Sequence, residues 1–150
     1  HTSIDSCIDC EAGTFAQEDG SASCTVCSFG KYASTAFSGC TSCPAGKYIT
    51  DDSETAELHT SIDSCIDCEA GKFAQEERSA SCTVCSYGKY SATASTGCTS
   101  CPSGRYITDD ATNAELHADL AACTNCQAGK RANAQIDAMS CVTCAFGKYS

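Results

Sequence analysis

The six residues Cys43-Pro-Ala-Gly-Lys-Tyr48 recur 58 residues later as Cys101-Pro-Ser-Gly-Arg-Tyr106. Both copies belong to a wider motif, C-x-x-C-x-x-G-[TKR]-[FYR], which occurs eight times and accounts for all 16 cysteines. The motif glycine predicts a backbone with positive φ or a close approach of two backbones, because only glycine accepts either without steric cost. An aromatic residue follows two positions later in seven of the eight copies. We therefore expect short extended pieces around the aromatics, with glycine-containing turns between the cysteine doublets.

The motifs are organised into a longer repeat. Residues 1–58 and 59–116 align without a gap and are identical at 45 of 58 positions, and residues 117–150 begin a third copy. Each of the three units starts with a histidine. The chain opens on histidine and stops within a motif, which suggests an excerpt of something longer. The prediction is two complete cysteine-rich units and one partial unit.

The composition argues against a conventional hydrophobic core. Leu, Ile, Val and Phe together number 18 of 150 residues, and the formal net charge is −10. Such a chain would ordinarily be disordered, but its cysteine content exceeds the level of about 8–10% that marks disulfide scaffolds. The acidic balance offers no basic face for nucleic acid, and no apolar run is long enough to span a membrane. Cross-links are expected to replace the core, in an oxidising, extracellular compartment.

Zinc is the main alternative use for the cysteines. Two C-x-x-C doublets separated by 13 residues are close to the spacing of zinc ribbons. However, a four-cysteine site consumes two doublets, whereas each 58-residue unit contains three. Nearly identical cysteines in the first two units would then need different partners. A redox-active use of the C-x-x-C doublets is a further alternative.

A pairing that steps forward by one doublet keeps the same partners in every unit. Bonds within each doublet also fit the period, but they would cross-link almost nothing. The stepwise ladder leaves Cys7 and Cys144 to bond with neighbouring repeats. Its seven predicted bonds are Cys10–Cys24, Cys27–Cys40, Cys43–Cys65, Cys68–Cys82, Cys85–Cys98, Cys101–Cys123 and Cys126–Cys141. In the chain-entropy description each contributes on the order of 3 kcal/mol.

The stretch C-P-A-G-K-Y followed by a later C-x-x-C resembles two families of extracellular cysteine-rich repeats. One is the first module of the tumour-necrosis-factor-receptor repeats, and the other is the ephrin-receptor-like repeat, which has an EGF-like style of small disulfide module. The resemblance covers essentially the whole chain, although proline occurs only at Pro44 and Pro102. It implies that the cysteine before P-x-G-x-Y pairs with the first cysteine of the next doublet, in agreement with the ladder.

Several other residues are candidates for a role. The repeated histidines His1, His59 and His117 are expected to be exposed loop residues, with a metal role as the alternative. Asp51 and Glu54 resemble a helix-capping box that precedes one or two helical turns at residues 56–58. The carboxylates considered for calcium are Asp51, Asp52, Asp109 and Asp110. The residues considered for O-glycosylation, between paired cysteines, are Thr25, Thr41, Thr83 and Thr99.

Two groups of aromatic residues are distinguished by their position. Those that end each motif are expected to lie over a disulfide or the adjacent turn, with carbohydrate binding as the alternative. Phe29, Tyr87 and Phe146 are surplus to that pattern and are candidates for contacts between strands of an assembly.

The fold class predicted from these patterns is an elongated solenoid of small disulfide-rich repeats. It has short β-hairpins, little helix and no large core, and each repeat contacts only its neighbours. No catalytic constellation or cofactor motif is visible, so we expect neither an enzyme nor a cofactor. The favoured function is a structural part of an extracellular filament, hair or surface fibre that binds copies of itself and carries glycans. The alternatives are the stalk or ectodomain of a receptor or adhesin and, third, a zinc-binding protein.

Overall fold

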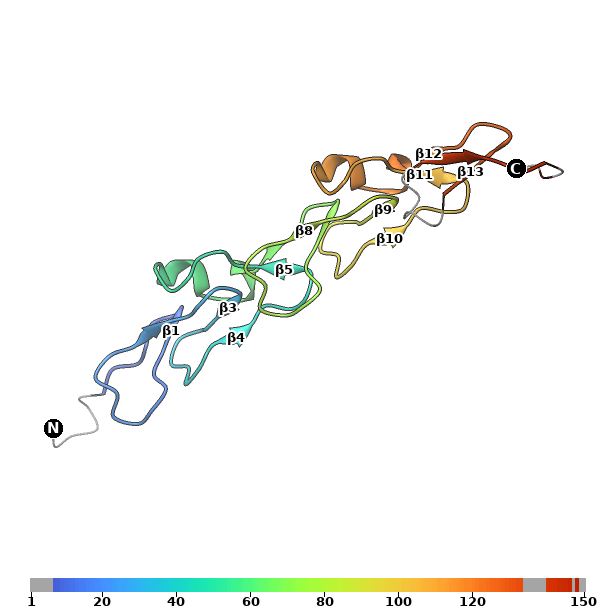
Figure 1. Cartoon of the computed structure of the whole chain (residues 1–150). Coiled ribbons are helices and arrows are strands. Elements are labelled where there is room, and N and C mark those ends of the chain that lie inside the picture. The colour runs from blue at the N-terminus through green and yellow to red at the C-terminus, as the bar shows by residue number, and fades with distance from the viewer. Residues whose placement is uncertain (1–6, 134–139, 147, 149–150) are drawn as a thin grey trace.

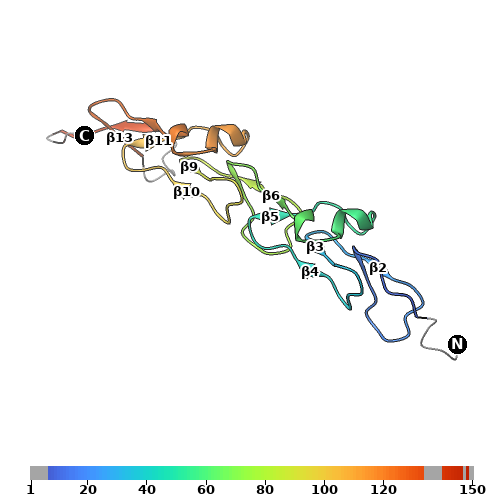
Figure 2. The same cartoon turned by 180° about the vertical axis from the view of Figure 1, so that it is seen from behind.

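The computed structural model describes residues 7–133, 140–146 and 148, and it is an elongated rod (Figure 1). The chain advances steadily from one end of the rod to the other, and the view from behind shows the same progression (Figure 2). His1 lies outside the described residues, and so do Gly147 and Tyr149, the glycine and the aromatic residue of the eighth motif. The predicted fold class is confirmed: the molecule is a series of small two-stranded hairpins with short helical turns and no large core.

The described part of the rod consists of seven antiparallel hairpins. In each hairpin, the last residues of one motif pair with the residues between the two cysteines of the next doublet. The pairs are β1 (Thr14–Phe15) with β2 (Thr25–Val26), β3 (Lys31–Tyr32) with β4 (Thr41–Ser42), β5 (Lys47–Tyr48) with β6 (Ile66–Asp67), β7 (Lys72–Phe73) with β8 (Thr83–Val84), β9 (Lys89–Tyr90) with β10 (Thr99–Ser100), β11 (Arg105–Tyr106) with β12 (Thr124–Asn125), and β13 (Lys130–Ala132) with β14 (Cys141–Thr143). We call each hairpin, with the disulfide that closes it, a module, and number the modules 1 to 7 along the chain.

The motif glycine occupies a tight turn immediately before each hairpin. In module 1 the Thr14 amide donates to the Glu11 carbonyl at 3.1 Å, and Gly13 is the third residue of that turn with φ of +86°. A positive φ at this position defines a type II turn and requires glycine. The prediction of positive φ is confirmed at all seven motif glycines that the structure describes. The first strand of each hairpin starts directly after this glycine and contains the last residue of the motif, which is aromatic in every module except module 7, where it is Arg131.

Consecutive modules are joined by backbone hydrogen bonds as well as by the chain. The Gly13 amide donates to the Ala33 carbonyl in module 2 at 2.7 Å, and the Ala33 amide donates to the His59 carbonyl in module 3 at 2.8 Å. Gly71, Ser91 and His117 repeat this chain of bonds 58 residues later. Together with the bond from the Gly46 amide to the Ala74 carbonyl at 2.8 Å, these bonds form a hydrogen-bonded spine that crosses each boundary from module 1 to module 6.

Packing reaches beyond the adjacent module, which corrects the expectation that each repeat contacts only its neighbours. A Cβ atom placed on Gly13 of module 1 would lie 1.9 Å from the Ala56 carbonyl oxygen of module 3, and one on Gly46 of module 3 would lie 2.2 Å from the Ala94 carbonyl oxygen of module 5. The side-chain-free glycine lets the backbone two modules further along approach closely. The close approach is therefore a second reason for glycine at the motif position, in addition to the positive φ.

Sulfur replaces most of the missing core. The buried apolar residues are chiefly half-cystines, joined by small or branched residues such as Ala33, Ile49 and Ile107. In module 3, Cys43, Ile49 and Cys65 form one cluster with Tyr32 of module 2 packed against it. The placement of Tyr32 agrees with the expectation that motif aromatics lie against a disulfide.

Short 3-10 turns occur in the two long loops that follow each C-P-[AS]-G motif. They are η2 (Ala56–His59) and η3 (Ile62–Ser64) in module 3, and η4 (Ala114–His117) and η5 (Leu120–Ala122) in module 6. Both pairs project from the same side of the rod (Figures 1 and 2). No helix among the described residues is long and apolar enough to cross a membrane.

Candidate functional site

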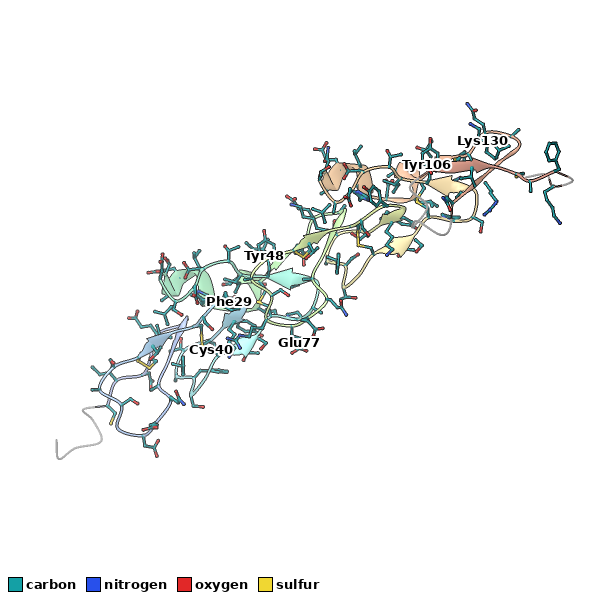
Figure 3. The ribbon with its side chains drawn as sticks, in the orientation of Figure 1. Phe29, Cys40, Tyr48, Glu77, Tyr106 and Lys130 are labelled. Atoms are coloured by element: carbon teal, nitrogen blue, oxygen red, sulfur yellow. A yellow bond between two sulfur atoms is a disulfide. The ribbon has the colours of Figure 1, made fainter. Side chains whose placement is uncertain are left out.

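The disulfide ladder is the dominant chemical feature of the rod, and its bonds are visible along the length of Figure 3. The seven bonds join the pairs that the stepwise counting argument predicts, with Cα–Cα distances of 5.7–5.9 Å. Five of them span 13 to 15 residues, and Cys43–Cys65 and Cys101–Cys123 span 22. Cys7 is an exposed free thiol and Cys144 a half-buried one. Their predicted bonds to neighbouring repeats stay a prediction.

The same geometry removes the main argument for zinc. The two cysteines of each internal doublet bond in opposite directions along the rod, so they do not converge on a common point. Within the ranges that the structure describes, no group of three or more His, Cys, Asp or Glu residues is placed to hold a metal ion. A ladder of this density indicates an oxidising environment.

The repeated histidines are not exposed, which corrects the sequence prediction for His59 and His117. Both rings have no accessible surface, and each lies between a long loop and the strand of the preceding module. His59 Nδ1 is 2.6 Å from the Lys31 carbonyl oxygen of β3, and Nε2 is 3.0 Å from Asp51 Oδ2. We call this group, His59 with Asp51 and the Lys31 carbonyl, the histidine clasp.

A second histidine clasp repeats the arrangement in module 6. His117 Nδ1 is 2.7 Å from the Lys89 carbonyl oxygen, and Nε2 is 3.1 Å from Asp109 Oδ2. Sequence reasoning missed the clasp because the partners are 8 and 28 residues away from each histidine. One signal in the sequence could have indicated the contact: the aspartate precedes the histidine by eight residues in both copies.

The aspartates of the clasps also organise the long loops. Asp51 Oδ2 accepts hydrogen bonds from the Glu54 and Thr55 amides at 3.1 and 3.0 Å, so it closes a loop turn before η2. The predicted capping box is wrong in detail, since the residue that precedes η2 is Thr55 and its side chain makes no cap. The Thr55 amide and then the His59 ring hold the pKa of the Asp51 carboxyl below its usual range.

Asp109 has an even richer set of donors. Its Oδ2 accepts from the Thr112 and Asn113 amides, both at 2.9 Å, and its other oxygen accepts from the Thr112 hydroxyl. The Thr112 hydroxyl, followed by the Asn113 amide, holds the pKa of this carboxyl well below its usual range. Carboxylate oxygens directed at internal donors are not presented to a cation, which argues against calcium at Asp51 and Asp109.

The surplus aromatic residues have different environments. The guanidinium of Arg78, in module 4, lies 5.3 Å from the ring centre of Phe29 in module 2, a cation–π contact between modules. Tyr87 hydrogen-bonds to Asp110, which raises the pKa of its hydroxyl. Phe146 is fully exposed. Phe29 is therefore used within the rod, whereas a contact between strands of an assembly stays a prediction for Phe146.

The threonines proposed for O-glycosylation are all exposed and all open the second strand of a hairpin. Each faces the aromatic of the preceding motif across the strand pair, for example Phe15 opposite Thr25 and Tyr32 opposite Thr41. Thr124, opposite Tyr106, is an equivalent position that sequence reasoning missed because its unit has diverged. Glycosylation of these residues stays a prediction.

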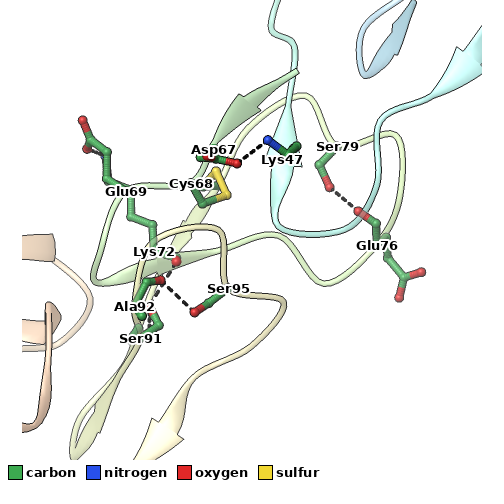
Figure 4. Close-up of a disulfide and its surroundings, with 12 residues drawn as sticks. Lys47, Asp67, Cys68, Glu69, Lys72, Glu76, Ser79, Ser91, Ala92 and Ser95 are labelled. Atoms are coloured by element: carbon green, nitrogen blue, oxygen red, sulfur yellow. Dashed lines mark hydrogen bonds and ion pairs between the residues drawn. A yellow bond between two sulfur atoms is a disulfide. The ribbon is translucent and has the colours of Figure 1, made fainter. Parts of the chain in front are cut away.

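Charged side chains add cross-strand contacts on the rod surface. Lys47 of β5 lies opposite Asp67 of β6, and its Nζ atom is 2.6 Å from Asp67 Oδ1 (Figure 4). Lys72 pairs with Glu69 within one turn at 2.9 Å. Exposed pairs of this kind contribute at most about 1 kcal/mol. These ion pairs therefore contribute little to the stability of the rod.

An open hollow of about 1170 Å³ lies at the N-terminal face of the described chain, lined in part by Cys7, Ile8 and Gly20. The residues of the second unit that are equivalent to Ile8 and Gly20 are Ile66 and Arg78, and both contact the first unit. Ile66 pairs with Tyr48, and Arg78 lies against Gly30.

Comparison with known proteins adds no family to this description. No protein-family model matches the chain, and no curated protein is significantly similar to it. The structure shows a tandem array of disulfide-rich repeats, an architecture that suits an extracellular structural or binding module.

Proposed function

We propose that this chain is a structural segment of an extracellular filament, hair or surface fibre. The observation that carries the proposal is the repeated docking of one module onto the next. The bond from Gly13 to Ala33 and that from Gly71 to Ser91 occupy equivalent positions, at 2.7 and 2.8 Å. Additional units can therefore extend the rod without a new kind of contact, as in other solenoids.

Covalent closure of each module supports a mechanical role. In the chain-entropy model each bond of this loop length stabilises the folded state by on the order of 3 kcal/mol, and seven bonds are distributed evenly along the rod. Pulling force would meet a cross-link in every module. Cys7 and Cys144 would continue the ladder into neighbouring repeats, and glycans on the exposed threonines would solvate the surface. The chain would act without catalysis and without a cofactor.

The test compares chains of one, two and four 58-residue units by small-angle X-ray scattering and negative-stain microscopy. A structural rod grows linearly in length with the number of units and collapses when its disulfides are reduced. In addition, the filament hypothesis requires regular self-association, measured by analytical ultracentrifugation. Oxidised rods that bend freely at every unit boundary would contradict the structural role.

A stalk or ectodomain of a receptor or adhesin is the second candidate, and one observation favours it. The long loops expose apolar side chains at equivalent places in two units: Leu58 and Ile62 at 51% and 43%, and Leu116 and Leu120 at 50% and 42%. Exposed apolar residues that recur on one side of a rod suit a partner surface. A monomeric rod that binds cells or a soluble ligand, and loses this binding on Leu58→Ser, would favour this candidate over the filament.

A further inference from the structure

The partners of each clasp histidine determine how many of its two ring nitrogens must carry a hydrogen. A carbonyl oxygen only accepts hydrogen bonds, so His59 Nδ1, at 2.6 Å from the Lys31 carbonyl, must carry a hydrogen. An ionised carboxylate also only accepts, so His59 Nε2, at 3.0 Å from Asp51 Oδ2, must carry one as well. A neutral imidazole has a hydrogen on only one nitrogen.

The alternative of a protonated aspartate is opposed by the donors around it. Asp51 Oδ2 already accepts from the Glu54 and Thr55 amides, and these bonds, with the His59 ring, lower the pKa of its carboxyl. The carboxylate therefore stays ionised. The fully bonded clasp is then an imidazolium ring, completely buried, between a carboxylate and a carbonyl oxygen.

We propose that each histidine clasp is a pH-sensitive lock that fastens the long loop of one module to the strand of the module before it. Protonated, the ring satisfies both acceptors. When it loses a proton, one buried nitrogen lone pair faces an acceptor lone pair, and that contact becomes repulsive. The rod is locked in mildly acidic conditions and loosened at its long loops in mildly alkaline ones.

The lock acts on the hydrogen-bonded spine because the same histidines also belong to it. The His59 backbone carbonyl accepts from the Ala33 amide at 2.8 Å, and the His117 carbonyl accepts from the Ser91 amide at 3.0 Å. These two amides are on the modules that precede the clasps. Their exchange with solvent therefore reports whether each loop remains attached.

Other titratable groups around the clasps do not account for the effect. Those on the packed segments of the first clasp are Lys31, Tyr32, Asp52, Glu54, Glu57 and Asp63, and those of the second are Lys89, Tyr90, Asp110, Glu115 and Asp119. Lysine, tyrosine and carboxyl side chains ordinarily titrate outside the interval from about pH 5.5 to 8.5. Imidazole is the side chain type that ordinarily changes charge within that interval.

The experiment measures hydrogen exchange of the Ala33 and Ser91 amides in the disulfide-intact chain at about pH 5.5 and about pH 8.5, corrected for intrinsic exchange rates. We expect protection of both amides to fall about five- to a hundredfold at the higher pH, the range for an unsatisfied buried polar group. Nitrogen-15 spectra at the lower pH should show hydrogen on both ring nitrogens of each clasp. Equal protection at the two pH values, or a ring nitrogen without hydrogen at about pH 5.5, would overturn the proposal.

The two clasps act as controls for each other. His59→Gln should abolish the pH dependence at Ala33 and leave that at Ser91, and His117→Gln should do the reverse. If the glutamine variants lose the loop altogether, Asp51→Asn provides a second variant that retains the histidine. It should reduce protection of Ala33 at about pH 5.5 towards the value at about pH 8.5, with Ser91 unchanged. A pH step at Ala33 that persists in His59→Gln would contradict the proposal.

Discussion

The close approach at the motif glycines makes a quantitative prediction for Gly46→Ala. Gly46 has φ of +85°, and alanine in this region costs about 1–2 kcal/mol. The new Cβ would lie 2.2 Å from the Ala94 carbonyl oxygen, so the two backbones must separate by about 1.2 Å to reach an ordinary contact of 3.4 Å. That movement strains the 2.8 Å bond from the Gly46 amide to the Ala74 carbonyl. Overpacking of this kind costs about 1–3 kcal/mol more.

The expected total for Gly46→Ala is therefore about 2–5 kcal/mol, measured as the change in the free energy of unfolding in guanidinium with disulfides intact. Gly104→Ala is a matched control, because Gly104 has φ of +81° but nothing within 4 Å of its added Cβ. It should cost only the conformational term of about 1–2 kcal/mol. Gly39→Ala, with open space and no positive φ, should be near neutral. A Gly46→Ala variant no less stable than Gly104→Ala would refute the contact between modules 3 and 5.

Three further predictions test the ladder and the loops. Replacing both Cys43 and Cys65 by serine opens a 22-residue span and should lower the free energy of unfolding by about 3–4 kcal/mol, as measured by chemical denaturation; no loss would mean that the ladder is not what stabilises module 3. Because the folded state lowers the pKa of Asp109 below its usual value of 3.8, its contribution is complete above about pH 4 and disappears as the pH falls through the folded-state pKa. Asp109→Asn should flatten this acid limb in a stability-versus-pH series, and an unchanged limb would count against the clasp geometry. Tyr87 should ionise at higher pH than an ordinary tyrosine in a spectrophotometric titration, and Asp110→Asn should remove the difference, since the carboxylate that raises the pKa is gone. A titration unaffected by the substitution would assign the raised pKa to another group.

Local rules and translational symmetry were sufficient to predict much of this molecule. The motif glycine predicts its own turn because positive φ is a property of one residue, and Gly13 illustrates this directly. Counting leaves Cys43 bonded either to Cys65 or within its own doublet, since a bonding pattern in near-identical units must repeat with the units, and the structure has the bond to Cys65. The low apolar content predicts an elongated, cross-linked chain without reference to any contact.

Only the tertiary structure determines the contacts between segments that are far apart in the chain. The sequence predicts His59 as an exposed loop residue because its partners, Asp51 and the Lys31 carbonyl, are not adjacent to it in the chain and no local pattern indicates them. The contact of Gly46 with Ala94 depends on how each module turns relative to the one before it. Repetition determines which residues are equivalent, but only the stacking angle between modules determines which of them meet. That angle is set by the summed packing and hydrogen bonding of whole modules, and no single motif encodes it.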